Sequence, residues 1–219
     1  MTQSTRDALI ASATRLMDEG GLDAVTLREV GRLTGVSHMA PYKHFSSKEE
    51  LLAAVAAQEL QQLRASIAEA GHHHRSSTAT LRTVMQGYVA WALAHPARFK
   101  LVFGAWTQRS KELDDAVTAT RTALVEVVAA DQRAGLLPEG DCKRLASLVL
   151  ALAHGAVDLT LAEPVSPRPA GQTSPEELVD DMFDRLNTDA ETVPREQAGP
   201  CGDAAGNQAT RSASTLGSR

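Results

Sequence analysis

The residues between Thr26 and Lys48 have the types and the spacing that phosphate binding requires. Thr26, Ser37 and the pair Ser46–Ser47 each stand where a short helix is expected to begin. A helix N-terminus leaves backbone N–H groups without intrahelical partners, and such groups bind phosphate oxygens. The whole chain has a formal net charge of −5, which argues mildly against a nucleic-acid partner, but residues 26–48 carry a local charge of +3. The charged residues there are Arg28, Arg32, Lys43 and Lys48, with Glu29 of opposite sign.

Three short helices are expected to position these residues. Apolar residues recur at three- and four-residue spacing over residues 5–19, and Gly20–Gly21 should end that helix. Residues 26–29 have the form of a capping box, in which Glu29 reaches back to the first backbone N–H, and they predict a second helix. Gly35 allows a tight turn before a third helix over about residues 38–44. This order is typical of a helix-turn-helix, whose last helix enters the major groove of DNA.

Several runs within residues 5–60 have a specific spacing. They are Thr26 to Val30, Gly35 to Ser37, Tyr42 to Phe45 and Lys48 to Leu51. In these runs the chain resembles the N-terminal signature of the TetR/AcrR family of transcriptional regulators. The resemblance implies an all-α fold of nine or so helices, with an N-terminal helix-turn-helix and a C-terminal ligand-binding bundle. It also implies a homodimer through the last two helices and an inducer pocket among the four helices that precede the last one.

The resemblance further implies roles for single residues. Phosphate contacts would be made by Tyr42, His44 and Lys48, and by the side chains and backbones of Thr26 and Ser37. The residues that would face bases or the groove edge are Ser37, His38, Met39 and Lys43. Arg28 could reach either a base or a phosphate.

Two residues depart from the family's usual pattern. Met39 stands where glycine is frequent, and Pro41 stands where an aliphatic residue is usual. Proline disfavours α geometry at the preceding residue, Ala40, so the third helix is expected to start late or to be distorted.

Structural roles would explain some of these residues equally well. Tyr42 could pack on the first helix, and Arg28 and Arg32 could be ordinary solvated charges. Phe45 is expected in the core.

Six longer helices are expected after residue 46, at about residues 48–68, 78–94, 97–106, 111–134, 140–162 and 174–187. The chain would then divide into a helix-turn-helix domain (1–48), a ligand-binding and dimerisation domain (49–189) and a disordered tail (190–219) without aromatic residues. The histidine run at 72–74 lies in an expected linker without other ligands nearby, so no metal site is expected.

Aromatic residues in the C-terminal half could line a cavity for an apolar or aromatic effector, or they could simply fill the core. Trp91, the run from His95 to Phe99, and Phe103–Gly104 are similar to a subgroup named for a Trp-His-Gly pattern. His154 and Asp158 are one turn apart on an apolar helix, and could pair with each other, meet a ligand, lie at the dimer interface or simply pack. The expected pocket residues are Met85, Tyr88, Trp91, Phe103, Trp106, Leu124, His154 and Asp158.

Other classes of protein are disfavoured. The sequence has no Gly-rich phosphate loop, no nucleophile elbow and no paired carboxylates, so an enzyme is not expected, and neither is a cofactor. Cys142 and Cys201 lack CxxC spacing, residues 1–12 have no apolar core of a signal peptide, and polar residues interrupt the apolar stretch 145–162. A cytoplasmic repressor that an effector releases from operator DNA is the main interpretation, and a ligand-binding protein of the same fold without DNA binding is the alternative.

Overall fold

The computed structural model describes residues 4–72, 79–106, 110–162 and 173–192. Within these ranges the chain forms eight α-helices and one 3-10 turn, with no strand. The all-α fold class is confirmed, with one α-helix fewer than expected. The difference lies at residues 38–44, where a helix was predicted and the structure has only the turn η1 (Pro41–Lys43).

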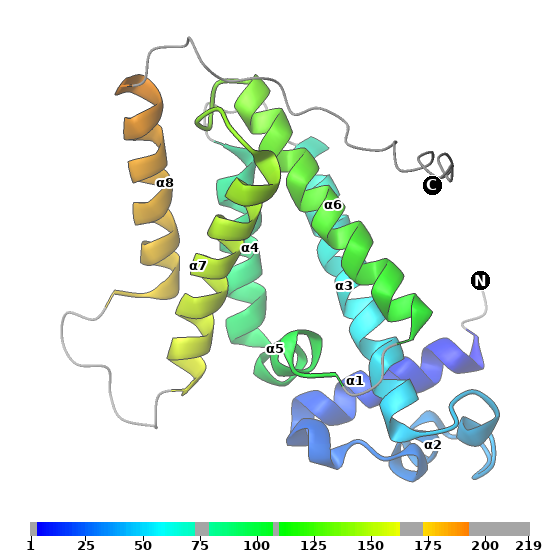
Figure 1. The fold of residues 1–219 in the computed structure, drawn as a ribbon. Coiled ribbons are helices and arrows are strands. Elements are labelled where there is room, and N and C mark those ends of the chain that lie inside the picture. The colour runs from blue at the N-terminus through cyan, green and yellow to red at the C-terminus, as the bar shows by residue number, and fades with distance from the viewer. Residues whose placement is uncertain (1–3, 73–78, 107–109, 163–172, 193–219) are drawn as a thin grey trace, which may run out of the picture.

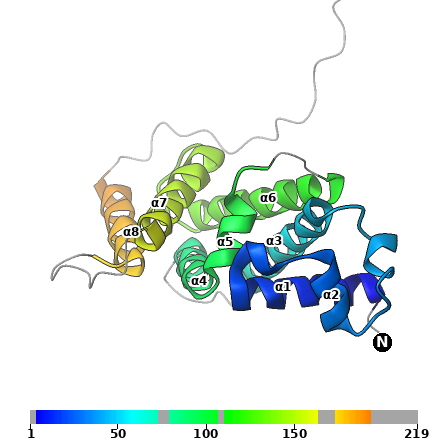
Figure 2. The same cartoon turned by 90° about the horizontal axis from the view of Figure 1, so that it is seen from below.

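The N-terminal helices lie across one end of the molecule (Figures 1 and 2). They are α1 (Thr5–Ala24) and α2 (Leu27–Thr34). The turn η1 and the long α3 (Lys48–His72) follow, and α3 runs from this end into the body of the molecule. The predicted end of α1 at Gly20–Gly21 coincides with a break in its helical geometry at Gly21, although helical residues resume after it. Gly21 has a φ of 72°, a left-handed value that glycine adopts without a Cβ penalty, so the helix kinks there and continues to Ala24.

The remaining helices form the larger part of the molecule. They are α4 (Thr80–Ala94), α5 (Pro96–Phe103), α6 (Lys111–Arg133), α7 (Cys142–Ala162) and α8 (Pro175–Thr192). The helices α3 and α6 run side by side, while α4, α7 and α8 pack together, with α8 at the outer edge (Figure 1). The short α5 lies between these helices and α1 (Figure 2), and Pro96 in its first turn accounts for the predicted break after α4.

Polar side chains fix two of these helix starts. At α8, Ser174 Oγ accepts a bond from Glu177 N (3.1 Å), and Glu177 Oε2 accepts one from Ser174 N (2.7 Å), so Ser174 caps this helix near its expected start. At α4 the N-cap residue, Ala79, makes no side-chain capping bond. Instead, the buried carboxylate of Asp131, on α6, accepts a hydrogen bond from Leu81 N (2.8 Å), which ties the start of α4 to α6.

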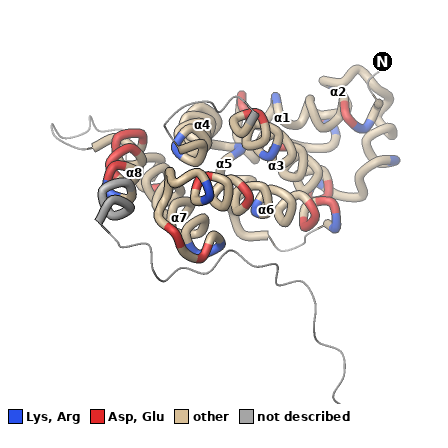
Figure 3. Tube along the Cα trace, turned by 90° about the horizontal axis from the view of Figure 1, so that it is seen from above, with Lys and Arg blue, Asp and Glu red and all other residues tan. Residues whose placement is uncertain are grey.

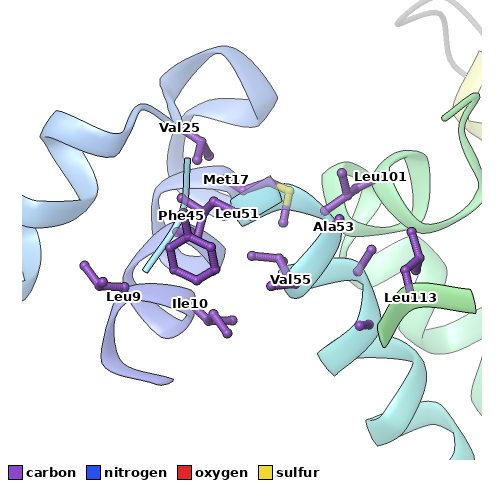
Figure 4. Packing of buried hydrophobic residues seen from close by; sticks show 14 of the residues in the cluster. Leu9, Ile10, Met17, Val25, Phe45, Leu51, Ala53, Val55, Leu101 and Leu113 are labelled. Carbon is purple, nitrogen blue, oxygen red and sulfur yellow. The ribbon is translucent and has the colours of Figure 1, made fainter. Parts of the chain in front are cut away.

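Two clusters of buried apolar residues hold the helices together. The first surrounds Phe45, which is buried as expected, and extends from α1 through α3 to Leu101 on α5 and Leu113 on α6 (Figure 4). The second lies among α4, α6, α7 and α8 and includes Phe99 of α5. Because α5 contributes side chains to both clusters, it connects the α1–α2 end of the molecule with the larger bundle.

Several expected boundaries shift. The helix predicted to end near residue 68 continues to His72, so the linker predicted from residue 71 begins later, and His73 and His74 lie outside the described residues. The last helix reaches Thr192, past the predicted start of the tail at 190, and residues 193–219 also lie outside. By length and composition α7 could span a membrane, the one described helix of that kind, but it packs against α4, α6 and α8 within the bundle.

Candidate DNA interface and effector cavity

The start of α2 is capped by Thr26, but only half of the expected capping box forms. Thr26 Oγ accepts a hydrogen bond from Glu29 N at 3.1 Å. The Glu29 carboxylate, predicted to reach back toward Thr26, instead accepts a bond from Arg32 Nε at 2.8 Å. Thr26 and Arg28 are both exposed, so this end of α2 is open to solvent.

The segment that replaces the expected third helix is held by bonds of 3-10 type. Ala40 N donates to Ser37 O (2.9 Å), and Lys43 N donates to Ala40 O (3.2 Å). Pro41 lacks the N–H that would continue an α-helical ladder from Ser37, which accounts for the tighter turn. The predicted departure of Ala40 from α geometry is wrong, because this residue has φ −64° and ψ −43°.

Pro41 anchors this segment to α2. Its side chain is buried, and a Cβ on Gly31 would lie only 2.8 Å from Pro41 Cγ. The proline therefore fills the inward position where the family usually has an aliphatic residue, and it does so because residue 31 has no side chain. With Pro41 turned inward, its neighbours His38, Met39 and Tyr42 are exposed.

Eight of the nine residues expected to bind DNA are exposed. Tyr42 is 45% exposed, and its ring centroid lies 5.9 Å from that of His38, so the two rings form one projecting feature. Lys48 is the exception: it is half-buried, and its Nζ donates to Leu22 O at 2.7 Å. An ammonium group has three donors, so a phosphate contact by Lys48 remains compatible with this bond.

The start of α3 offers fewer free N–H groups than expected from Ser46–Ser47. Glu50 Oε2 accepts bonds from both the N and the Oγ of Ser46, each 2.7 Å long, and Ser47 Oγ accepts one from Glu50 N at 3.2 Å. Ser47 thus caps α3, while Glu50 reaches back to Ser46 N and not to Ser47 N, as a capping box would require. Two hydrogen bonds lower the pKa of Glu50, the larger effect coming from the Ser46 side chain and the smaller from the Ser46 backbone. The negatively charged carboxylate therefore lies at the start of α3, where a phosphate was expected to bind.

A cavity of about 1820 Å³ lies among α3, α4, α6 and α7. Seven of the eight residues predicted to form the pocket line it, namely Met85, Tyr88, Trp91, Phe103, Trp106, Leu124 and His154. Asp158 does not, because it lies exposed on another face of α7. The aromatic residues of the C-terminal half therefore do more than fill the core.

A hydrogen-bonded pair lies within the mostly apolar lining. Tyr88 Oη is 2.9 Å from His154 Nδ1, so His154 pairs with Tyr88 and not with Asp158. The rings of Phe99 and Phe103 lie 4.9 and 5.0 Å from that of His154. Burial raises the pKa of the Tyr88 phenol, which is therefore a neutral hydrogen-bond donor.

An ionic cluster between α1, α3 and α5 was not expected from the sequence. Arg98 Nε donates to Asp18 Oδ1 at 2.9 Å, and Arg98 Nη1 donates to Glu59 Oε1 at 3.3 Å. Glu59 is only 2% exposed, and its Oε2 has no hydrogen-bond partner among the described residues. The bond to Asp18 raises the pKa of Arg98 still further. Asp18 and Glu59 lie far from Arg98 along the chain, so no local sequence pattern predicts these contacts.

Charges of both signs surround the α1–α2 end, whereas acidic residues follow α8 (Figure 3). The acidic side chains of α8 include Glu176, Glu177, Asp180, Asp181 and Asp184. A nucleic acid is therefore disfavoured at α8, and the exposed segment after α2 remains the better candidate.

Comparison with known proteins agrees with this arrangement. Residues 9–55 match the family model of bacterial regulatory proteins of the tetR family, and residues 81–186 match that of the tetracyclin repressor-like C-terminal domain. These descriptions name no subgroup, so the Trp-His-Gly resemblance stays a prediction. Among curated proteins, no match to the chain was found.

Solved structures share the fold over most of their length. A protein of unknown function from Rhodococcus sp. RHA1 is 28% identical, with a TM-score of 0.71, covering 86% of this chain and 96% of that one. The TetR family regulator PfmR from Thermus thermophilus is 21% identical, with a TM-score of 0.59 and coverages of 83% and 98%. The regulator FadR from Bacillus subtilis, solved with stearoyl-CoA, is 13% identical, with a TM-score of 0.64 and coverages of 83% and 97%.

The two family models together span more than half of the chain. The first matches the end that contains α1 and α2, and the second matches the bundle that contains the cavity. The protein belongs to the TetR family of DNA-binding transcriptional regulators.

Proposed function

We propose that the protein is a cytoplasmic repressor that leaves its operator when a small molecule enters the cavity among α3, α4, α6 and α7. The observation that carries this proposal is the joint presence of an exposed segment after α2 and a large, mostly apolar cavity in the same chain. The first is suited to a DNA groove and the second to an effector. Residues 1–48 would act as the DNA-binding domain and residues 49–189 as the sensor and dimerisation domain.

At the operator, the exposed side chains of residues 37–44 would enter the major groove. Tyr42 and His44 would contact phosphates beside the groove, together with Thr26, Ser37 and the remaining donors of Lys48. Ser37, His38, Met39 and Lys43 would meet base edges or the groove edge, and Arg28 would reach a base or a phosphate.

A homodimer through α7 and α8 would place two such segments on one duplex. Leucines on these two helices are exposed in the monomer, including Leu148 (60%), Leu159 (72%) and Leu178 (39%). Isolated exposed leucines are ordinary, but a row along neighbouring helices indicates a surface that another copy covers. The two segments would then lie about 34–36 Å apart, one turn of DNA.

The effector would be an apolar or aromatic small molecule. The cavity is larger than the roughly 300–1,000 Å³ of an ordinary drug-sized site, which favours a ligand with an extended apolar part. The FadR regulator that shares this fold was solved with stearoyl-CoA, a ligand with such a part. Binding would stabilise a conformation with differently spaced reading segments, and operator affinity would fall accordingly.

Titration of DNA from upstream of the protein's own gene tests the proposal. The double variant Tyr42→Ala with Lys43→Ala should remain folded and dimeric but lose most of its operator affinity. It should also show a shallower salt dependence, because phosphate contacts release counterions. The control is Arg133→Ala, which removes an exposed cation from the last turn of α6. Unchanged affinity in the double variant would refute the assignment of Tyr42 and Lys43 to the DNA interface. No DNA binding by the native protein at low salt would favour the ligand-binding protein without DNA binding.

A further inference from the structure

The Tyr88–His154 pair is a polar feature placed within an apolar wall. Tyr88 comes from α4 and His154 from α7, so the pair bridges two helices that border the cavity. Nearby lining residues include Leu60, Leu63, Ile67, Leu124 and Leu150. The lining also includes the charged residues Glu69, Arg121, Glu126 and Lys143, so the pair is one of several polar features available to orient a ligand.

The hydrogen bond bears on which ring nitrogen of His154 carries the proton. Tyr88 is buried and its phenol stays neutral, so its O–H requires an acceptor. Among the described residues, the structure gives that hydroxyl one hydrogen-bond partner, His154 Nδ1 at 2.9 Å. If Nδ1 kept the proton, the hydroxyl hydrogen would be left without an acceptor in a buried place. In the tautomer with the proton on Nε2, the Tyr88 O–H donates to Nδ1 and has its acceptor within the protein, which favours this tautomer.

The Nε2–H of His154 is left available. In the part of the chain that the structure describes, no group forms a hydrogen bond with Nε2, and this nitrogen is not among the buried atoms that lack a partner. It is therefore accessible, and His154 borders the cavity beside the rings of Phe99 and Phe103, which also contact each other. Those rings offer no strong acceptor, so the donor can be satisfied only by water or by a ligand.

We infer that the effector carries a carbonyl or carboxylate oxygen on a long apolar body, and that this oxygen accepts the hydrogen bond from His154 Nε2. This inference rests on the proposed effector function of the cavity and names the chemical class of the ligand. An alkylammonium ion of the same length, the form that an alkylamine takes at neutral pH, has no lone pair to accept from Nε2–H, and the Nδ1 lone pair is already used by Tyr88. The site therefore selects ligands that accept a hydrogen bond over ligands that only donate.

Intrinsic fluorescence can measure this preference directly. The chain has two tryptophans, Trp91 and Trp106, and both line the cavity. The probes are dodecanoate, methyl dodecanoate and dodecylamine, which share one chain and differ in the head group. The native dimer should bind the ester and the acid at least about tenfold more tightly than the amine, the equivalent of one hydrogen bond to the ligand. Equal affinity for all three, or binding of none, would overturn the inference.

Two variants separate hydrogen bonding from packing. Tyr88→Phe keeps the ring and releases Nδ1, so the histidine can adopt either tautomer, and the preference for the ester over the amine should narrow. His154→Phe keeps a ring beside Phe99 and Phe103 and should abolish the preference, while amine binding changes little. A loss of affinity that is equal for all three probes would show a purely structural role. Arg121→Ala, at an exposed lining residue, is the control: if it alone abolishes acid binding, the carboxylate is held by that arginine and not by His154.

A measurement without mutation covers the case in which a variant fails to fold. Nitrogen NMR of the histidine rings in the native protein should show His154 protonated on Nε2, and its signal should shift when the ester binds. Protonation on Nδ1 would overturn the inference. Probe binding that leaves operator affinity unchanged would count against the proposed regulation and leave the ligand class intact.

Discussion

A single pair of residues, Gly31 and Pro41, sets the shape of the segment proposed to read DNA. Pro41 packs where a side chain on residue 31 would stand, and this contact turns Tyr42 outward. Side chains at helix interfaces are packed as densely as organic crystals, so even one methyl group cannot be added without a shift. The exposed reading surface therefore depends on a buried contact that touches no DNA.

Gly31→Ala should weaken operator binding although residue 31 is buried. Alanine favours the helix by up to about 1 kcal/mol, but the new methyl group overpacks against Pro41 at a cost of about 1–3 kcal/mol. We expect a small net loss of stability, measured by urea denaturation, and a larger loss of operator affinity as residues 38–44 shift. The double variant with Pro41→Ala should regain part of the affinity. If it binds no better than Gly31→Ala alone, the contact does not position the segment.

Arg98 and Glu59 show that a buried charge can depend on a single partner. Glu59 is almost fully buried, and the Arg98 guanidinium is the cation that the structure places beside it. Removal of one member of such a pair leaves an unpaired buried charge, which typically costs about 3–5 kcal/mol. Arg98 is partly exposed, which reduces the cost by admitting water.

Arg98→Met should therefore destabilise the protein by about 2–3 kcal/mol in chemical denaturation. Combining it with Glu59→Gln removes the buried charge and should recover most of that loss. Lys100→Met, an exposed cation of the same helix, is the matched control and should change stability little. Additive effects of the two substitutions would mean that the Arg98–Glu59 contact carries no coupling energy.

At the scale of the element, most helices could be predicted because their signals are local. Apolar spacing and caps such as Ser174 and Ser47 act within a few residues, and the structure confirms them. The segment after α2 could not be placed as well, because Pro41 removes a ladder bond and then packs on another helix. The cavity residues were found because aromatics on consecutive helices converge. The Arg98 cluster was missed because its partners lie 80 and 39 positions away in the chain.

The hydrogen bonds at the start of α3 predict that the stability of the fold depends on pH. The bonds from Ser46 lower the pKa of Glu50 in the folded protein, so this carboxylate stabilises the fold above its unfolded pKa of about 4.3. That contribution is lost as the pH falls through the lowered folded pKa. Glu50→Gln should thus be less stable than the native protein at neutral pH, and the difference should shrink as the pH falls through the lowered folded pKa in urea titrations. Glu139→Gln, in the exposed loop before α7, is the control, and its difference in stability from the native protein should not change with pH. If the difference for Glu50→Gln is also constant with pH, the Glu50 carboxylate does not make the proposed contribution.

At the scale of the whole molecule, α7 has more apolar surface than one chain buries. It is the described helix apolar enough to span a membrane, yet it packs among three other helices and carries His154 toward the cavity. A second copy of α7 and α8 would cover the exposed leucines in a four-helix interface. The same helix would then border both the effector and the partner subunit, so a ligand that shifts α7 would alter the spacing of the two DNA-reading segments.

Charges placed in this surface should separate the subunits. The double variant Leu148→Lys with Leu159→Lys introduces four lysines at the centre of the proposed four-helix interface, where unpaired charges are costly to desolvate. Sedimentation should show a monomer that remains helical by circular dichroism, because both leucines are exposed in a single chain. Operator affinity should fall by more than about tenfold, since a monomer contacts one half-site instead of two. The control, Ala130→Lys on the exposed side of α6, should stay dimeric. If the double variant Leu148→Lys with Leu159→Lys is also a dimer, the interface lies elsewhere.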